Sequence, residues 1–408
     1  MLPFPMSTGA RRSGFGLLLL SLAWGCTSAP QYDLVIRGGT SLDGSGEAPF
    51  VGDLAISGGV IMAVGDVGTA EGTTEIDATG KAVSPGFVNL MSWATETMIE
   101  DGRAMSDILQ GVTLEVMGEG TSMGPIPDSL KEWARSQQGD IQYEIEWTSL
   151  GEYLEFLESR GVSPNVASFI GATTARMNVL GFEDRSPTTQ ELERMQEIVR
   201  EAMREGALGL ASALIYTPGN FADTPELIAL AEAAGEYDGI YISHLRSEGN
   251  QLLESLEELI TIAREADVPA EIYHLKAAGE ENHDKMDQVI QRVEEARGQG
   301  MRITADMYTY TAGATGLDAA MPTWSQEGGP EAWYALLQDQ ETRGRIGLEM
   351  VTPTDEWENL FLAAGSPENV LLVGFRQDSL KYLTGKSLAE VSAMRGTSPE
   401  ATAMDLVY

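Results

Sequence analysis

Two of the three histidines of the chain follow predicted strands that are one strand–helix–strand unit apart. An apolar run over residues 240–242 leads to His244, and a second run over residues 268–273 leads to His274. Leucines and isoleucines recur at helical spacing over residues 252–262 between them. A unit of this kind needs about 30 residues, and its strands are usually parallel neighbours about 4.8 Å apart. Both imidazoles are therefore expected at the carboxyl edge of one parallel sheet, where α/β folds build their sites.

Each histidine has a cation two residues later, Arg246 after His244 and Lys276 after His274. In a strand, residues two apart share a face. Adjacent imidazoles flanked by two cations suit a metal ion that acts on an anionic or carbonyl substrate. The alternative is a pair of structural histidines that cap unrelated strands.

The composition limits the class of protein. With 408 residues the chain is long enough for one large α/β domain and a smaller one, and its hydrophobic content of 43% supports a packed core. A net charge of −36 argues against nucleic acid or an anionic membrane surface as a partner. The sequence does not indicate an oligomeric state.

The N-terminus predicts export. Arg11 and Arg12 precede an apolar stretch, residues 15–24, of signal-peptide length. Residues 1–28 are therefore predicted to be a signal peptide, and Cys26, the single cysteine, is placed as in a lipoprotein signal. The protein is expected to be periplasmic or a membrane-anchored lipoprotein through Cys26, and otherwise secreted.

The rest of the chain has two rhythms. Residues 29–84 read as short alternating strands with glycine turns and no long helix, which predicts a small β-sandwich-like domain. Residues 85–408 alternate strands and helices over seven units, which predicts a (β/α)8 TIM-type barrel. Residues 311–350 are expected to be an insertion over the barrel mouth, and residues 369–373 a further strand. Because the chain stops where an eighth strand is due, we expect the barrel to be incomplete at the C-terminus.

Several phrases resemble the amidohydrolase superfamily, and within it the N-acyl-D-amino-acid deacylases (D-aminoacylases). They are YDLVIRGGTSLDGSG near the start, SPGF at residues 84–87, SHLRSEG around His244, YHLKAAG around His274 and ADMYTYTAGATGLDA from Ala305. The resemblance covers roughly residues 32–408. It implies zinc-dependent hydrolysis of an amide, with His244 and His274 as metal ligands, and a β-domain completed by a C-terminal segment.

The chain also departs from this family. Met91 and Trp93 stand where the family has a His-x-His pair, and neither residue can ligate zinc. Gly120 falls near the place of a cysteine ligand, with Glu119 beside it. The resemblance also implies a catalytic aspartate on the last barrel strand, which we expect to lie beyond the end of this sequence. One metal position is therefore expected to be lost, which favours one zinc ion over two.

Glu119 is predicted to complete the remaining site. With His244 and His274 it would form a His2Glu set with an open fourth position. Strand alternation would put Glu119 on the same face as Glu115 and Met117. Two alternatives stay open, a solvated strand-end glutamate and a general base that does not bind the metal.

Four residues are candidates for substrate binding. Lys276 is predicted to bind a substrate carboxylate or polarise a carbonyl, and a surface lysine is the alternative. Arg246 either recognises a carboxylate or pairs with Glu248. Tyr308 and Tyr216 are predicted pocket residues, with Tyr216 just after a strand.

Two rival functions remain. A barrel without its first-strand ligands could bind a ligand without catalysis. Alternatively, residues 120–124 match the G-x-S-x-G nucleophile elbow of a serine hydrolase, with Ser122 as the nucleophile. Pro125 and Pro127 follow where that motif requires a helix. The favoured prediction is a metal-dependent amidohydrolase that acts on small N-acyl amino acids or related amides.

Overall fold

The computed structural model describes residues 31–408, and these form two compact units that divide between Pro85 and Gly86. The predicted signal peptide and Cys26 lie outside the described residues. Among the residues described, no helix combines the length and apolar character needed to cross a membrane.

The first unit is a mixed β-sheet. Its central strand β1 pairs antiparallel with β2 and parallel with β4 and β5. β2 and β3 form the hairpin that the glycine turn predicted, because Gly58 and Gly59 both adopt the positive φ such a turn needs. The strands are β1 Gln31–Ser41, β2 Phe50–Ser57, β3 Val60–Gly65, β4 Glu71–Asp77 and β5 Ala82–Val83.

The second unit is built on parallel strands in chain order. β6, β7 and β8 form one sheet, and β9 to β13 form another. The amide of Phe169, between β8 and β9, donates a hydrogen bond to the Met117 carbonyl at 2.9 Å. This bond makes the two sheets continuous at that point. The strands are β6 Phe87–Asn89, β7 Val112–Met117, β8 Asn165–Ser168, β9 Ile170–Gly171, β10 Gly209–Ala213, β11 Ile240–His244, β12 Ala270–Ile272 and β13 Ile303–Ala305.

Helices pack along these strands in sequence, α6 against α7, α7 against α8, and α8 against α9. Their starts follow from local sequence, since Ser149–Glu152 and Thr188–Glu191 form capping boxes that open α4 and α6. On α8 the residues Leu252, Leu256 and Leu259 are buried in the main hydrophobic core. The helices are α1 Thr97–Glu100, α2 Met105–Ile108, α3 Asp128–Gln137, α4 Leu150–Arg160, α5 Ala172–Val179, α6 Thr189–Arg204, α7 Thr224–Gly235, α8 Leu252–Glu265 and α9 Met286–Gly298.

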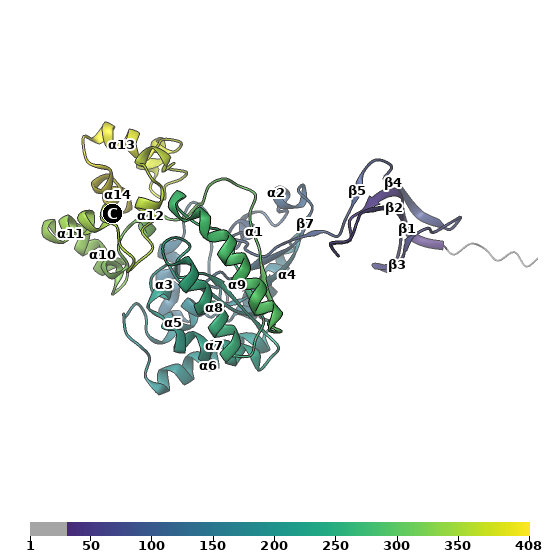
Figure 1. Cartoon of the computed structure of the whole chain (residues 1–408), viewed down its shortest axis with the longest axis horizontal. Coiled ribbons are helices and arrows are strands. Elements are labelled where there is room, and N and C mark those ends of the chain that lie inside the picture. The colour runs from purple at the N-terminus through teal and green to yellow at the C-terminus, as the bar shows by residue number, and fades with distance from the viewer. Residues whose placement is uncertain (1–30) are drawn as a thin grey trace, which may run out of the picture. The chain divides into compact units, whose positions relative to one another are not determined.

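The C-terminal part of this unit is helical (yellow-green in Figure 1). It has a small core of its own that includes Trp333, Ile346 and Met404. The predicted strand over residues 369–373 is wrong, because only an isolated bridge joins Leu371 to Ser387. The helices are α10 Pro330–Gln338, α11 Gln340–Met350, α12 Leu360–Ala363, α13 Leu388–Arg395 and α14 Pro399–Val407.

A buried ion pair ties α5 to α7. Arg176 Nη1 lies 2.6 Å from Glu226 Oε2, and both side chains are 1% exposed. The Arg176 guanidinium also donates to the carbonyls of Glu183 and Arg185. The pair thus holds the segment that leads into α6 against the neighbouring helix.

Glu226→Gln is expected to lower the free energy of unfolding by about 3–5 kcal/mol, because it leaves the buried Arg176 charge without its counterion. Urea denaturation followed by circular dichroism measures this. Glu236→Gln, which breaks the more exposed pair with Arg200, is the matched control and should cost about 1 kcal/mol or less. Equal losses of unfolding free energy in the two variants would contradict the stabilising role of the buried Arg176–Glu226 pair.

Candidate metal centre

The structure places Glu119 in the site by a turn rather than by strand alternation. β7 ends at Met117, and Gly118 has φ +104, a conformation that side chains disfavour. A Cβ on Gly118 would also lie 2.5 Å from the carbonyl oxygen of Phe169. Met117 packs in the main hydrophobic core, whereas Glu119 reaches the histidines. The predicted common face of the two residues is therefore wrong.

His244 is the last residue of β11, and its side chain is buried. His274 lies two residues beyond β12, in the left-handed region with φ +36. Asp306, just after β13, accepts a hydrogen bond from the His274 amide at 2.7 Å. This neighbouring-strand contact stabilises a backbone conformation that costs energy for a residue with a Cβ.

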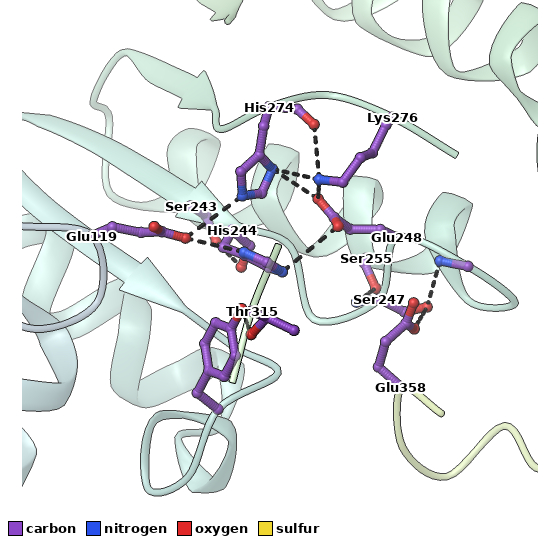
Figure 2. Close-up of polar contacts among 12 residues, drawn as sticks. Glu119, Ser243, His244, Ser247, Glu248, Ser255, His274, Lys276, Thr315 and Glu358 are labelled. Carbon is purple, nitrogen blue, oxygen red and sulfur yellow. Dashed lines mark hydrogen bonds and ion pairs between the residues drawn. The ribbon is translucent and has the colours of Figure 1, made fainter. Parts of the chain in front are cut away.

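The three predicted ligands converge (Figure 2). Glu119 Oε1 lies 3.1 Å from His244 Nδ1 and 3.6 Å from His274 Nε2. The two rings meet edge to face with centroids 4.5 Å apart. One donor atom from each of the three residues lies within 4.8 Å of the others, and all three side chains are buried. Two imidazole nitrogens and a carboxylate oxygen form a donor set that suits zinc and leaves a position open.

The electrostatics keep Glu119 ionised. Burial raises its pKa, but hydrogen bonds and charge interactions with His244 and His274 outweigh this and hold the pKa well below its usual range. For His274, burial lowers the pKa, while hydrogen bonds to Glu119 and Glu248 raise it to about 9. An ionised carboxylate in contact with both imidazoles is of the chemical type that ligates zinc.

Glu248 is a buried site residue that the sequence analysis considered only as a partner of Arg246. Its Oε1 lies 2.9 Å from His274 Nδ1 and 2.7 Å from Lys276 Nζ, and its Oε2 lies 3.7 Å from His244 Nε2. The contact with Lys276 brings that predicted residue into the site. No regular spacing pointed to it in the sequence, because residues 245–249 lie in the loop between β11 and α8.

Trp93 contacts the site from the segment after β6. Its indole Nε1–H donates to Glu119 Oε2 at 2.8 Å, although the Trp93 residue is 62% exposed overall. Met91 is half-buried and packs on the inner core of Val116 and Ile242. At the two positions where the resemblance implied histidines, this chain therefore has one packing residue and one hydrogen-bond donor to a predicted ligand.

The two predicted tyrosines line the same region. The Tyr216 and His244 rings lie 5.4 Å apart, and the Tyr216 hydroxyl hydrogen-bonds with Thr315 Oγ1 at 2.8 Å. The Tyr308 ring lies 5.4 Å from Lys276 Nζ and 6.2 Å from the His274 ring.

Arg246 points elsewhere. It forms a two-pronged ion pair with Glu258 on α8, at 2.9 Å for each contact, and donates to the carbonyls of Asn220 and Ala222. The predicted pairing of Arg246 with Glu248 is wrong. The guanidinium borders a separate cavity of about 730 Å³ beside residues 353–359.

Ser122 lacks the setting of a nucleophile elbow. Its Oγ donates to the Gly124 carbonyl at 2.6 Å and accepts from the Gly171 amide at 3.2 Å. Residues 122–127 are not helical, and α3 begins only at Asp128. The strand–turn–helix geometry of that motif is therefore missing at this position.

Known proteins resemble this chain. It is 32% identical over 290 residues to the D-aminoacylase of Alcaligenes xylosoxydans xylosoxydans. The aligned region covers 70% of this chain and 58% of that relative. It is 31% identical over 312 residues to the N-acyl-D-aspartate deacylase of the same organism, covering 74% and 62%. The chain thus spans about three fifths of the length of these curated relatives. No protein-family model matches it.

Solved structures of D-aminoacylases and related deacylases also resemble this chain. A crystal structure of D-aminoacylase, described as defining a subset of amidohydrolases, superposes with a TM-score of 0.72 at 27% identity, covering 92% of this chain and 70% of that one. An N-acyl-D-glutamate deacylase from Bordetella bronchiseptica, complexed with zinc and a phosphonate inhibitor, shares the fold with a TM-score of 0.73 at 24% identity, covering 92% and 70%. The predicted resemblance to D-aminoacylases and N-acyl-D-amino-acid deacylases is confirmed, and the fold is an α/β fold of the D-aminoacylase kind.

The purified chain is expected to bind one zinc ion, and His244→Ala or His274→Ala should abolish binding because each removes one of three ligands. Metal content after dialysis, measured by plasma mass spectrometry, tests this. His283→Gln is the control, since His283 is exposed in the short 3₁₀ helix Glu280–Lys285 before α9. Retention of a full equivalent of zinc by His244→Ala would refute the site.

Proposed function

We propose that the chain carries the metal site of an amide hydrolase that acts on N-acyl amino acids, with the site at the carboxyl end of a (β/α)8-type barrel. The observation that carries this proposal is the convergence of Glu119, His244 and His274 from three strand ends. The names of the relatives, which are D-aminoacylase and N-acyl-D-amino-acid deacylases, support the substrate class and D-configuration.

A single zinc ion fits the donor set, and when bound it would supply a Lewis acid and lower the pKa of water. Glu119, His244 and His274 would hold it. The position of Glu119 Oε1 beside both imidazoles favours its role as a ligand over that of a general base.

The remaining residues would bind and orient the substrate. Lys276 is a half-buried cation beside the ligands, so its ammonium can interact with a substrate carboxylate or an amide carbonyl. Tyr308 lies against Lys276 and His274, and Tyr216 lies against His244, so both rings limit the access of water to the ligands. Arg246 is not part of this proposal, because its guanidinium is already paired with Glu258.

The two rival functions are less well supported. A binding barrel without metal would not need three buried ligand groups that face one point. A serine hydrolase would need a base for Ser122, whose hydroxyl instead donates to the Gly124 carbonyl.

The zinc-loaded chain is expected to hydrolyse N-acetyl-D-amino acids faster than their L-enantiomers. His244→Ala should lower kcat/KM by about 10²–10³-fold, because the charge stabilisation at the carbonyl is lost. Release of the free amino acid, followed by a ninhydrin-type assay, measures this, with His283→Gln as the control. Equal rates for His244→Ala and the wild type would sink the proposal.

Export with a lipid anchor on Cys26 is a further part of the proposed function. It rests on the N-terminal sequence alone, in which an apolar stretch preceded by Arg11 and Arg12 ends at this cysteine. Cells that express the full chain should incorporate labelled palmitate into it, and Cys26→Ser should abolish the label. An unlabelled but exported protein would indicate plain secretion instead.

A further inference from the structure

Each imidazole of the site has two ring nitrogens, and both nitrogens of both rings face a carboxylate (Figure 2). His244 directs Nδ1 toward Glu119 and Nε2 toward Glu248. His274 is turned the opposite way, with Nε2 toward Glu119 and Nδ1 toward Glu248. The two glutamates thus lie on opposite sides of the pair of rings.

We propose that Glu248 is the positioning residue of the metal site, which holds the N–H of both imidazoles so that His244 presents Nδ1 and His274 presents Nε2 to the metal. The inference rests on the proposed function and extends it to a residue that does not touch the metal. One carboxylate would serve two ligands, Oε1 for His274 and Oε2 for His244.

The chemistry of imidazole makes such a residue necessary. A neutral ring has one N–H and one bare nitrogen, and only the bare nitrogen binds a metal. A carboxylate at the other nitrogen selects the tautomer and fixes the plane of the ring. His244 Nε2 is buried and has no hydrogen-bond partner in the described structure, and Glu248 Oε2 faces it at 3.7 Å. A small shift of this ring would complete the contact.

The position of Glu248 is itself well fixed. It is 6% exposed, and its backbone carbonyl accepts a hydrogen bond from the Ala278 amide at 2.7 Å. That bond connects the loop after β11 with the segment after β12, so one peptide links the regions that carry the two histidines. Lys276 Nζ balances the charge of Glu248 at 2.7 Å.

Lys276 is the competing candidate for the partner of His274, because Nζ also lies 2.9 Å from His274 Nδ1. An ammonium cannot accept a hydrogen bond, so it could only donate to a bare Nδ1. In that case Nε2 would carry the proton and could not bind the metal. Lys276 has two other acceptors, Glu248 Oε1 and the His274 carbonyl. The two arrangements therefore predict opposite tautomers.

Nuclear magnetic resonance on the zinc-loaded protein, labelled with ¹⁵N at histidine, decides between them. The chain has only three histidines, and His283→Gln removes the one outside the site. We expect zinc on Nδ1 and a proton on Nε2 of His244, and the reverse for His274. The same tautomer on both rings would overturn the proposal without touching the proposed function.

Variants supply a second measurement. Glu248→Gln and Glu248→Ala should weaken zinc binding by about 10–100-fold in chelator competition, the usual effect of removing a residue that orients a ligand. The loss should be smaller for glutamine, which keeps one acceptor oxygen. Glu254→Gln is the matched control, because Glu254 is exposed in the first turn of α8.

The outcomes are separable. Wild-type zinc affinity in both Glu248 variants would refute the positioning role, as would an equal loss in Glu254→Gln. A Lys276→Met variant that loses zinc affinity while Glu248→Gln keeps it would assign the role to Lys276. If the wild type binds no zinc, the proposed function fails and the positioning role fails with it. If the Glu248 variants do not fold, the tautomers of the wild type still give the answer.

Discussion

A single buried carboxylate shared by two imidazoles is the constraint on which the site depends. Burying an ionised glutamate is costly unless it is paired and hydrogen-bonded. Glu119 meets this requirement with His244, His274 and the indole of Trp93. Each partner comes from a different strand end, so the carboxylate and its partners require the sheet to be assembled in register. The left-handed turn at His274 is one part of the structure that this convergence demands.

The first strand of the barrel region also differs from what the family resemblance implied. One structural neighbour, a D-aminoacylase, has a binuclear metal centre that one metal activates and a second attenuates. Here Trp93 stands at the place predicted for a first-strand histidine, and its indole Nε1–H donates a hydrogen bond to Glu119 Oε2. That oxygen is engaged, and Glu119 Oε1 alone faces the imidazoles. Trp93 therefore donates a hydrogen bond to the predicted ligand Glu119, at a position where the family resemblance implied a histidine that ligates a second ion.

Much of this arrangement could be predicted from the sequence because periodicity and chain order are local properties. Helical spacing after His244 predicted α8, and two apolar runs at the right separation predicted parallel neighbours with both histidines at one edge. The similar spacing of His244 to Arg246 and of His274 to Lys276 was misleading in one respect. Lys276 turns into the site, whereas Arg246 turns to Glu258, because β11 ends at His244 and alternation no longer applies beyond it.

The sequence by itself determined the order of the parallel strands and their helices as far as β13, the pair of histidines, and the presence of Met91 and Trp93 where the family resemblance implied histidines. Only the tertiary structure decided which atoms face each other. Glu119 lies beside the two histidines as predicted, but strand alternation does not place it there. The positive φ of Gly118 and the close approach of Phe169 direct it, and neither follows from a period of two. Glu248 became recognisable as a site residue only when folding placed it between two rings. Distances between side chains on separate strands depend on sheet register and turn geometry, and the spacing of residues along the chain does not contain them.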